Sequence, residues 1–506
     1  MIRHSERLLA ALLALLLLGA PLPFGGVVAW AAALVAALGC AALVLAAMAL
    51  DHPAALRPAA LPAAALAGLA LLGLLQASPL PPGAVSALSP EHARLERQAA
   101  ELTGEPVHAR LTLAAGPSRR AALGWAVAAA VFLAAAVAGR RRELRRWLAG
   151  AVLAGGLFQV FFGAHDWFAR ARTLWGVDLH ASATRLRGTF VNPNHLALYL
   201  EMALPLAFAW TWWAARRAGD EPRAERRVLL LAPPAMIWLT LFAGLSFSGS
   251  RAGLLAAMVA VSVQGLLVAR GARRRWWVAP LGGLAALAGV ALVAALGFQE
   301  GLGRLASTTG VDGSLGARLL EYRAALGIWR RFPVTGAGLG TFRDAFPLVQ
   351  PLELRGTWWH PHSDLLEVLV TGGLLGAALL ALGGWWMARR LGTVLRDGGR
   401  SEDRAAALAA LGILVSLALH ENLDFGLTMP GNAVTLAALL GAVTLARTRE
   451  RSAQPDRAGE ELAAVQAGDL EHVEAARERR RATDGHRRSR RRRADREHPH
   501  RGAVDS

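Results

Sequence analysis

The chain has 506 residues, of which 54% are hydrophobic and only 18% are charged, and its mean hydropathy is +0.35. A soluble protein of this length carries more charge and fewer apolar blocks near the ~20 residues that span a bilayer, so the composition excludes a soluble globular enzyme. The net charge of +18 comes from arginine alone, because the sequence contains no lysine, and guanidinium groups suit carboxylate and phosphate partners. The single cysteine, Cys40, excludes an intrachain disulfide and a cysteine metal cluster.

Apolar blocks recur along the chain at the length that a helix needs to cross a bilayer. We expect about twelve membrane-spanning helices and therefore an all-α, polytopic transmembrane bundle. The first block runs through Pro21-Leu22-Pro23 into the second, which is typical of a first helix rather than of a cleaved signal peptide. The predicted spans are 8–20, 27–50, 61–77, 121–138, 147–163, 195–214, 228–245, 252–269, 277–297, 364–387, 405–424 and 431–446.

Arginine gathers in four short loops between these spans, which predicts the orientation of the bundle. Loops of this kind lie in the cytoplasm under the positive-inside rule. If the spans alternate, the four loops share one side with both termini, which supports an even number of spans. Three long segments, at about 78–120, 164–194 and 298–363, then lie on the opposite, outer face. The loop arginines are Arg140, Arg141, Arg142, Arg145, Arg146, Arg216, Arg217, Arg223, Arg226, Arg227, Arg270, Arg273, Arg274, Arg275, Arg389, Arg390, Arg396 and Arg400.

The chain changes character near residue 446, so we expect a membrane domain at 1–446 and a basic tail at 447–506. The tail contains a run of arginines at 487–493 and little apolar content after Val473, a composition typical of disorder. Its charge favours contact with anionic membrane lipid at the cytoplasmic face. No aromatic residues accompany this charge, so we do not predict nucleic acid as a partner.

The second outer segment ends in a motif that opens a helix, Arg185-Leu186-Arg187-Gly188-Thr189-Phe190-Val191-Asn192-Pro193-Asn194. Asparagine accepts hydrogen bonds from the first free amides of a helix, and proline fixes φ in its first turn. The N-terminus of a helix attracts anions. An ordinary helix start and an anion site are both compatible with the pattern, and the two preceding arginines favour the anion site.

Two further arginines stand at turns or helices of the outer face. Arg251 follows a tight turn of small residues close to membrane level, where an unpaired arginine is costly. Its alternative partners are Glu201, inside the sixth predicted span, and a phosphate group of a ligand. Arg318 lies in a predicted amphipathic helix at 315–329. The glycine-rich stretch at 332–342 lacks the lysine and the spacing of a phosphate-binding loop, which excludes a nucleotide site of that kind.

The polar segment at 358–367 meets an apolar helix and brings together two histidines, a serine and two carboxylates. His360 and His362 lack a third ligand at a familiar spacing, so we do not predict a metal site. A histidine at an aqueous edge is a candidate general base, and Asp364 or Glu367 could orient it. The alternative is an interfacial histidine beside a tryptophan pair.

A late polar segment, His420-Glu421-Asn422-Leu423-Asp424, lies at the outer end of the eleventh predicted span. It either completes the site or merely caps its helix, and both interpretations stay open. Asp424 is therefore a candidate auxiliary residue.

Taken in this order, the motifs resemble the O-antigen ligase superfamily, which includes O-antigen ligases, O-antigen polymerases and protein O-oligosaccharyltransferases. Each motif alone is a weak signal, whereas the ordered set on a polytopic scaffold is fairly specific. The resemblance covers residues 8–446 and leaves out the tail. The matching elements are Arg185, Gly188-Thr189-Phe190, Asn192-Pro193-Asn194, Ser250-Arg251, Arg318, Pro333, Gly336, Gly338, Gly340, His362-Ser363, Gly373 and Gly376.

The resemblance implies a glycosyltransferase of the GT-C type that needs neither a metal nor another cofactor. Such an enzyme takes a glycan from an undecaprenyl-diphosphate carrier at the periplasmic side of the bacterial inner membrane. It implies His362 as the catalytic histidine and Arg185, Arg251 and Arg318 as contacts to the diphosphate. The auxiliary candidates are Arg187, His360, Asp364, Glu367 and Asp424.

The chemistry of sugar diphosphates agrees with that assignment. Negative charge develops on the bridging oxygen as the diphosphate leaves, and several arginines can offset it where no divalent cation does. His362 then deprotonates or orients the acceptor hydroxyl. In-line attack on the anomeric carbon predicts inversion of its configuration.

The acceptor is open, because lipid A–core, a growing glycan and a protein hydroxyl are nucleophiles of one type. We favour an O-antigen ligase of lipopolysaccharide biosynthesis that uses lipid A–core. An O-antigen or exopolysaccharide polymerase and a protein O-oligosaccharyltransferase are the alternatives. A transporter of the same lipid-linked sugar belongs to a different class, and it has no need of a base at one face.

Overall fold

The computed structural model describes residues 4–104, 108–179, 184–271, 315–397 and 400–446. Over these residues the fold is a bundle of α-helices with a single two-stranded hairpin. Eight helices within the described ranges are long and apolar enough to cross a membrane. The protein is therefore a polytopic helical membrane protein, as its sequence predicts. The predicted span at 277–297, residues 298–314 of the third outer segment and the tail at 447–506 lie outside the described residues.

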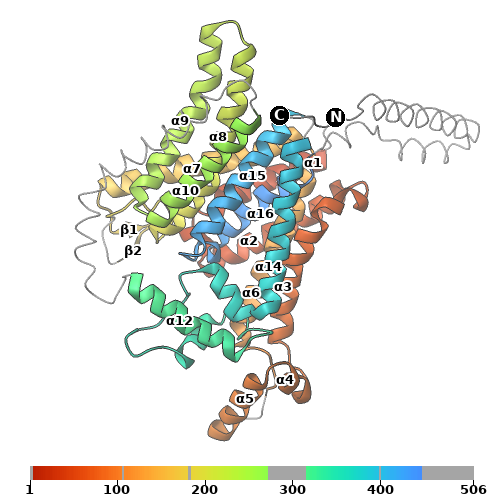
Figure 1. The fold of residues 1–506 in the computed structure, drawn as a ribbon, viewed down its shortest axis with the longest axis vertical. Helices are drawn as coiled ribbons and strands as arrows, with labels where there is room; N and C mark the ends of the chain where they lie inside the picture. The colour runs from red at the N-terminus through yellow and green to blue at the C-terminus, as the bar shows by residue number, and fades with distance from the viewer. Residues whose placement is uncertain (1–3, 105–107, 180–183, 272–314, 398–399, 447–506) are drawn as a thin grey trace, which may run out of the picture. The chain divides into compact units, whose positions relative to one another are not determined.

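Short connections join most neighbouring helices (Figure 1). In chain order the helices are α1 (His4–Gly19), α2 (Ala29–Ala49), α3 (Arg57–Ala77), α4 (Pro82–Leu88), α5 (Pro90–Thr103), α6 (Ala115–Gly139), α7 (Arg142–Phe168), α8 (Pro193–Asp220), α9 (Ala224–Ser248), α10 (Arg251–Gly271), α12 (Leu315–Arg331), α13 (Phe342–Ala345), α14 (Asp364–Asp397), α15 (Ser401–His420) and α16 (Pro430–Thr444). The short 3₁₀ turns are η1 (Phe24–Gly26), η2 (Pro53–Leu56), η3 (Phe346–Leu348) and η4 (Gly426–Thr428), and β1 (Thr173–Leu174) pairs antiparallel with β2 (Val177–Asp178).

Each predicted span that falls within the described residues coincides with a helix, but three of these helices do not qualify as spans. The blocks at 8–20 and 431–446 form α1 and α16, which have 16 and 15 residues, whereas a bilayer core needs about 20. The block at 195–214 lies in α8, where His195 and Glu201 shorten the apolar run. Within the described residues, eight of the predicted spans therefore qualify by length and composition.

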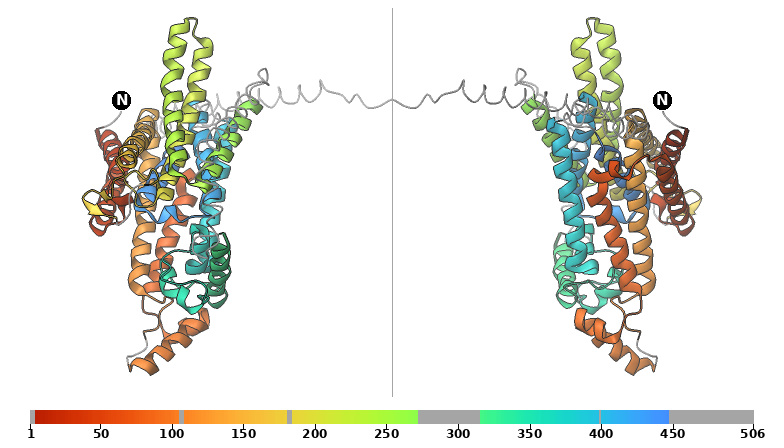
Figure 2. Two further views of the ribbon diagram at one scale, coloured as in Figure 1. Left: turned by 90° about the vertical axis from the view of Figure 1, so that its left-hand side faces the viewer. Right: turned by 90° about the vertical axis from the view of Figure 1, so that its right-hand side faces the viewer.

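The arginine-rich turn between α6 and α7 lies beside the first turns of α1 and α15. Arg141 pairs with Glu6 of α1, and Arg142 and Arg145 both pair with the buried Asp403 of α15. Both views of Figure 2 place the α8–α9 hairpin and the α4–α5 pair at opposite ends. The α8–α9 hairpin and the α4–α5 pair therefore mark opposite ends of the bundle.

Helix α14 is interrupted at Gly373. This break sets the position of the first turns of the helix. Gly373 has φ 64° and ψ −164°, a combination that is almost confined to glycine. The loop after α12 inserts its backbone at the break and supplies the hydrogen-bond partners that a broken helix loses. The bridging bonds join Ala337 N to Val370 O (3.0 Å), Gly338 N to Thr371 O (2.9 Å), Leu374 N to Pro333 O (2.9 Å) and Leu375 N to Val334 O (3.2 Å).

The broken helix and the inserted loop together form a backbone joint. Gln76, which is fully buried in the last turn of α3, hydrogen-bonds both parts of this joint. Its Nε2 donates to Thr335 O (2.5 Å) and Thr371 O (3.1 Å), and its Oε1 accepts from Leu339 N (2.9 Å). A buried polar group that loses its partner costs about 1–3 kcal/mol, so these bonds favour one position of the loop. The first turns of α14 are therefore held against α3 and the loop after α12.

A buried histidine of α5 locks the α4–α5 pair onto this loop. His92 Nδ1 lies 2.7 Å from Ser89 Oγ, and its Nε2 lies 3.4 Å from Ala337 O. The ring also packs against Phe332, with 4.4 Å between centroids. Burial lowers the pKa of His92 to about 4, so the ring is neutral at physiological pH.

We expect the α4–α5 pair to lose stability as the pH falls from about 6.5 to 4. The unfolded chain takes up a proton near pH 6.5, whereas folded His92 does so near pH 4. Protons therefore favour the unfolded state in this window, by up to about 3 kcal/mol at its lower end. Amide hydrogen exchange over residues 76–113, corrected for the intrinsic rate at each pH, measures the effect. His92→Gln should flatten the pH dependence, and an unchanged dependence would contradict this account.

Candidate active site

The loop before α14 ends in a strained histidine and a helix cap. Ser363 Oγ accepts a hydrogen bond from Leu366 N (3.2 Å) and thereby caps α14. His362, directly before this cap, has φ +40°. A positive φ is uncommon outside glycine, and such strain clusters at functional sites. Backbone strain therefore coincides with the predicted catalytic histidine.

Helix α12 contacts both the side chain and the backbone carbonyl of His362. Glu321 Oε2 lies 3.1 Å from His362 Nδ1. Tyr322 OH donates to His362 O (2.8 Å) and to Asn422 O (3.0 Å). Burial raises the pKa of Glu321, although its hydrogen bond to His362 and the charge of Arg318 oppose this effect. The histidine is thus fixed by the helix that also carries a predicted diphosphate contact.

Glu321 and Tyr322 were not among the residues predicted from the sequence. A signal for them was present, because they stand three and four positions after Arg318 in a predicted helix. Residues at these spacings share one face of a helix. The face that presents Arg318 therefore also presents Glu321 and Tyr322.

Phe425 lies at the centre of a group of three histidines. His360 stacks on its ring with 4.8 Å between centroids, while His362 and His195 meet it edge-on at 5.4 Å and 4.9 Å. His360 Nδ1 also lies 2.8 Å from Glu367 Oε2. Burial acts to lower the pKa of His360, but the hydrogen bond to Glu367 and nearby negative charge outweigh burial and raise it. His360 is therefore more easily protonated than a free histidine, which suits a charged partner better than a base.

The connection from α15 to η4, residues 421–425, touches the other elements of the site. Arg318 Nη1 donates to Leu423 O (3.1 Å), and Ser363 Oγ donates to Glu421 O (3.1 Å). Asp364 N donates to Asp424 O (3.2 Å). This segment therefore joins α12 and α14 rather than merely ending its own helix.

Arg185 reaches the same connection through an asparagine. Arg185 Nη2 donates to Asn194 Oδ1 (3.0 Å), and Asn194 Nδ2 donates to Asp424 Oδ2 (2.5 Å). Arg185 Nε also donates to Ser248 O (2.6 Å). Asn192 caps α8 by accepting from Asn194 N (2.9 Å), which confirms the helix start predicted from this motif. Arg185 and Arg318 are thus tied to adjacent residues of the connection.

Arg251 stands at the first position of α10, three residues after the carbonyl that Arg185 binds. Ser250 Oγ caps this helix by accepting from Gly253 N (3.2 Å). The Arg251 side chain is exposed and makes no hydrogen bond or ion pair within the described residues. Its alternative partner Glu201 is buried and instead contacts His420 Nδ1 (2.6 Å) and Ser416 Oγ (2.6 Å). The structure therefore leaves Arg251 available to a ligand.

Arg187 does not join this group. Its side chain is buried and donates from Nη2 to Ala171 O (3.2 Å), in the loop before β1. Asp364 lies in the site, but its contacts go to the connection: its Oδ2 accepts from Leu427 N (2.7 Å), and its carboxyl bonds that of Glu421. Neither residue contacts His362 through a hydrogen bond, so neither orients it directly.

No group of three or more His, Cys, Asp or Glu residues in the described ranges is placed to hold a metal ion. The site contains guanidinium and imidazole groups beside the carboxylates of Glu321, Glu367 and Asp424. The guanidinium and imidazole groups can hold a phosphate by charge-assisted hydrogen bonds, and an imidazole can also accept a proton. The arrangement can therefore bind an anion and remove a proton beside it.

Comparison with known proteins identifies one family domain in the chain. The family model described as O-Antigen ligase matches residues 235–381, a range that includes Arg251, Arg318, His362 and Gly373. Arg185 and the connection at 421–425 lie outside the matched range. No curated protein matches the chain. The matched domain, on a polytopic helical scaffold, supports the resemblance to the O-antigen ligase superfamily.

Proposed function

We propose that the protein is a metal-independent glycosyltransferase that moves a glycan from an undecaprenyl-diphosphate carrier to an acceptor hydroxyl. The observation that carries this proposal is the meeting of strained His362 with Arg318 and Arg185 on the connection at 421–425. Transfer from a sugar diphosphate needs a proton acceptor and fixed positive charge beside each other. His362 and the two arginines supply candidates for both.

In this proposal Arg185, Arg251 and Arg318 bind the diphosphate and offset the charge that develops on the leaving oxygen. Arg185 and Arg318 are partly oriented before substrate binds, because each donates to a fixed acceptor of the chain. Arg251 makes no hydrogen bond or ion pair within the described residues, and the N-terminus of α10 adds a dipole that also favours an anion. His360, whose pKa is raised by Glu367, adds an imidazole that takes up a proton more readily than a free histidine does.

His362 is the general base of the proposed reaction. It removes the proton of the acceptor hydroxyl as the oxygen attacks the anomeric carbon from the side opposite the diphosphate. The bond to the diphosphate breaks with its electron pair, so the product has inverted configuration. The products are the glycosylated acceptor, undecaprenyl diphosphate and a proton.

We place the site at the periplasmic face of the bacterial inner membrane and both termini in the cytoplasm. Support comes from the arginine-rich α6–α7 turn and α8–α9 hairpin, because such connections stay in the cytoplasm. The membrane domain then comprises residues 1–446, and the tail at 447–506 meets anionic lipid of the cytoplasmic leaflet.

Lipid A–core is the acceptor we favour, which makes the protein an O-antigen ligase of lipopolysaccharide biosynthesis. Polymerisation of O-antigen or exopolysaccharide, and transfer to a protein hydroxyl, use the same donor chemistry and are the alternatives. Transport of the lipid-linked sugar is the competing class. A strained histidine hydrogen-bonded to a buried carboxylate favours chemistry over transport, because strain of this kind accompanies catalytic geometry.

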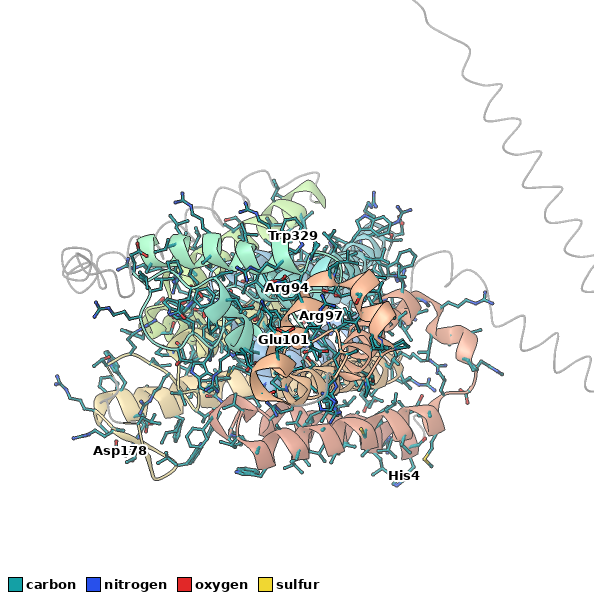
Figure 3. The ribbon with its side chains drawn as sticks, turned by 90° about the horizontal axis from the view of Figure 1, so that it is seen from below. His4, Arg94, Arg97, Glu101, Asp178 and Trp329 are labelled. Carbon is teal, nitrogen blue, oxygen red and sulfur yellow. The ribbon has the colours of Figure 1, made fainter. Side chains whose placement is uncertain are left out.

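Arg318→Ala tests the proposed role of the arginines in binding the diphosphate of the donor. We expect purified Arg318→Ala protein to release undecaprenyl diphosphate about 10²- to 10³-fold more slowly than wild type, the usual cost of one lost charge-stabilising donor. The carrier is quantified by mass spectrometry, with and without a chelator, which should have no effect. Arg97→Ala is the matched control, since Arg97 is an exposed residue of α5 at the end facing the viewer in Figure 3. Equal rates for both variants, or strong inhibition by the chelator, would refute the proposed mechanism.

A further inference from the structure

We infer that Glu321 is the positioning residue of His362, a role that rests on the function proposed above. Its carboxylate accepts the Nδ1–H of the imidazole, which leaves Nε2 as the nitrogen that takes the acceptor proton. Glu321 Oε2 and His362 Nδ1 are 3.1 Å apart. A histidine acts as a base through one nitrogen only, and the hydrogen bond of the other nitrogen decides which one.

The two side chains of the pair differ in their exposure to solvent. The Glu321 side chain is 0% exposed and that of His362 is 31% exposed. The carboxylate is therefore shielded from solvent, while part of the His362 side chain is open to it. Trp358 and Phe425 both meet the imidazole edge-on, at 5.6 Å and 5.4 Å, and restrict its rotation.

Glu321 has few other partners. Its Oε1 is buried and has no hydrogen-bond partner among the described residues. Its charge is balanced by His362 and by Arg318 on the preceding turn, while burial raises its pKa. The attraction between Glu321 and His362 is therefore greatest when the imidazole has taken a proton. Such an interaction favours the transition state over the ground state.

The proton balance of the step follows from this geometry. Neutral His362 begins with its proton on Nδ1 and its lone pair on Nε2. The acceptor O–H bond breaks as the bond from oxygen to the anomeric carbon forms, and the proton moves to Nε2. The imidazolium is then paired with the Glu321 carboxylate until the proton passes to water. Glu321 itself neither gains nor loses a proton.

The second histidine–carboxylate pair of the site differs from this one. His360 bonds Glu367 at 2.8 Å, but its ring lies flat on Phe425 with 19° between the planes. Its pKa is raised, so it takes up a proton more readily than a free histidine does. His362 has backbone strain and a contact from Tyr322 that His360 lacks among the described residues. The pair formed by Glu321 is therefore the one built for base chemistry.

Glu321→Gln tests the inference, because glutamine keeps the shape of the side chain and removes its charge. We expect kcat to fall between about 10²- and 10⁴-fold, with little change in the donor KM. The acidic limb of the activity profile should move to lower pH, since no carboxylate remains to stabilise the protonated ring. Glu321→Asp should recover part of the rate. Glu101→Gln, on α5 (Figure 3), is the control and should behave as wild type.

A readout without substrate separates this inference from the proposed function. Diethylpyrocarbonate modifies neutral imidazole, and peptide mass spectrometry reports the rate at His362 against pH. Glu321→Gln should shift this profile to lower pH whether or not the protein glycosylates an acceptor. If the profile shifts but no acceptor is glycosylated, the proposed function is wrong and the positioning role of Glu321 is supported. If wild type is active and Glu321→Gln leaves both pH profiles unchanged, the positioning role is overturned. This conclusion holds even if the amount of the variant protein changes. If glutamine prevents folding, Glu321→Asp is measured in the same two ways, and unshifted profiles would overturn the role equally.

Discussion

Replacing His362 with alanine is expected to lower the rate of glycosyl transfer by about 10²- to 10⁴-fold, which is the usual contribution of a general base. The amount of protein in the membrane should stay the same, because the imidazole is 31% exposed and fills little of the core. Loss of the ring leaves the acceptor hydroxyl without a proton acceptor, while the arginines still bind the diphosphate. Binding of the donor should therefore survive in the variant.

The measurement is the initial rate of transfer at equal protein concentration, with donor binding measured in parallel. His165→Ala is the matched control, since this histidine of α7 is 80% exposed. A His362→Ala variant that transfers at the rate of the control would remove His362 from the mechanism. A variant that also fails to bind donor would assign the residue to binding rather than to proton transfer.

Replacing Gly373 with alanine should destabilise the protein by roughly 2–5 kcal/mol, because two independent costs add. The backbone there has φ 64° and ψ −164°, which side chains rarely adopt. A methyl group would also collide with Val334 O and Gly336 N, which belong to the inserted loop. The loop and α14 would have to separate, and the hydrogen bonds of Gln76 would be lost with them.

Gly384→Ala provides a matched control on the same helix. Gly384 has helical geometry, and a methyl group there meets nothing within 4 Å. Alanine at such a position is neutral or slightly stabilising. The thermal unfolding midpoint of purified protein in detergent measures both variants. A Gly373→Ala midpoint equal to that of Gly384→Ala would contradict the account of the joint.

The positions of the helices were predictable from hydropathy, because a chain in lipid must satisfy its backbone groups within each span. The break in α14 was not predictable in the same way. Gly373 lies in an apolar block like the glycines around it, and only the inserted loop gives it a positive φ. Gly336 and Gly338 also have positive φ, at 73° and 114°. The matching motif at 333–340 and Gly373 are thus two halves of one backbone joint.

The site was predictable in its residue types but not in its pairings. His362, Arg185 and Arg318 were identified by motif, and the structure brings all three to one short connection. Asp364 and Glu367 were expected to orient a histidine, and Glu367 does so for His360 rather than for His362. No local pattern predicts that choice, because it depends on how α12 packs against α14.

The most direct test of the central claim follows both products of the reaction in purified, full-length protein. The donor is an undecaprenyl-diphosphate glycan, and the two acceptors are lipid A–core and a second carrier-linked glycan. A transferase predicts one undecaprenyl diphosphate released for each glycan that appears on an acceptor, with a chelator present. Glycan on lipid A–core identifies a ligase, and a lengthened carrier-linked glycan identifies a polymerase. Donor that binds and stays intact with either acceptor would contradict transfer to a glycan and favour the protein-acceptor and transporter alternatives.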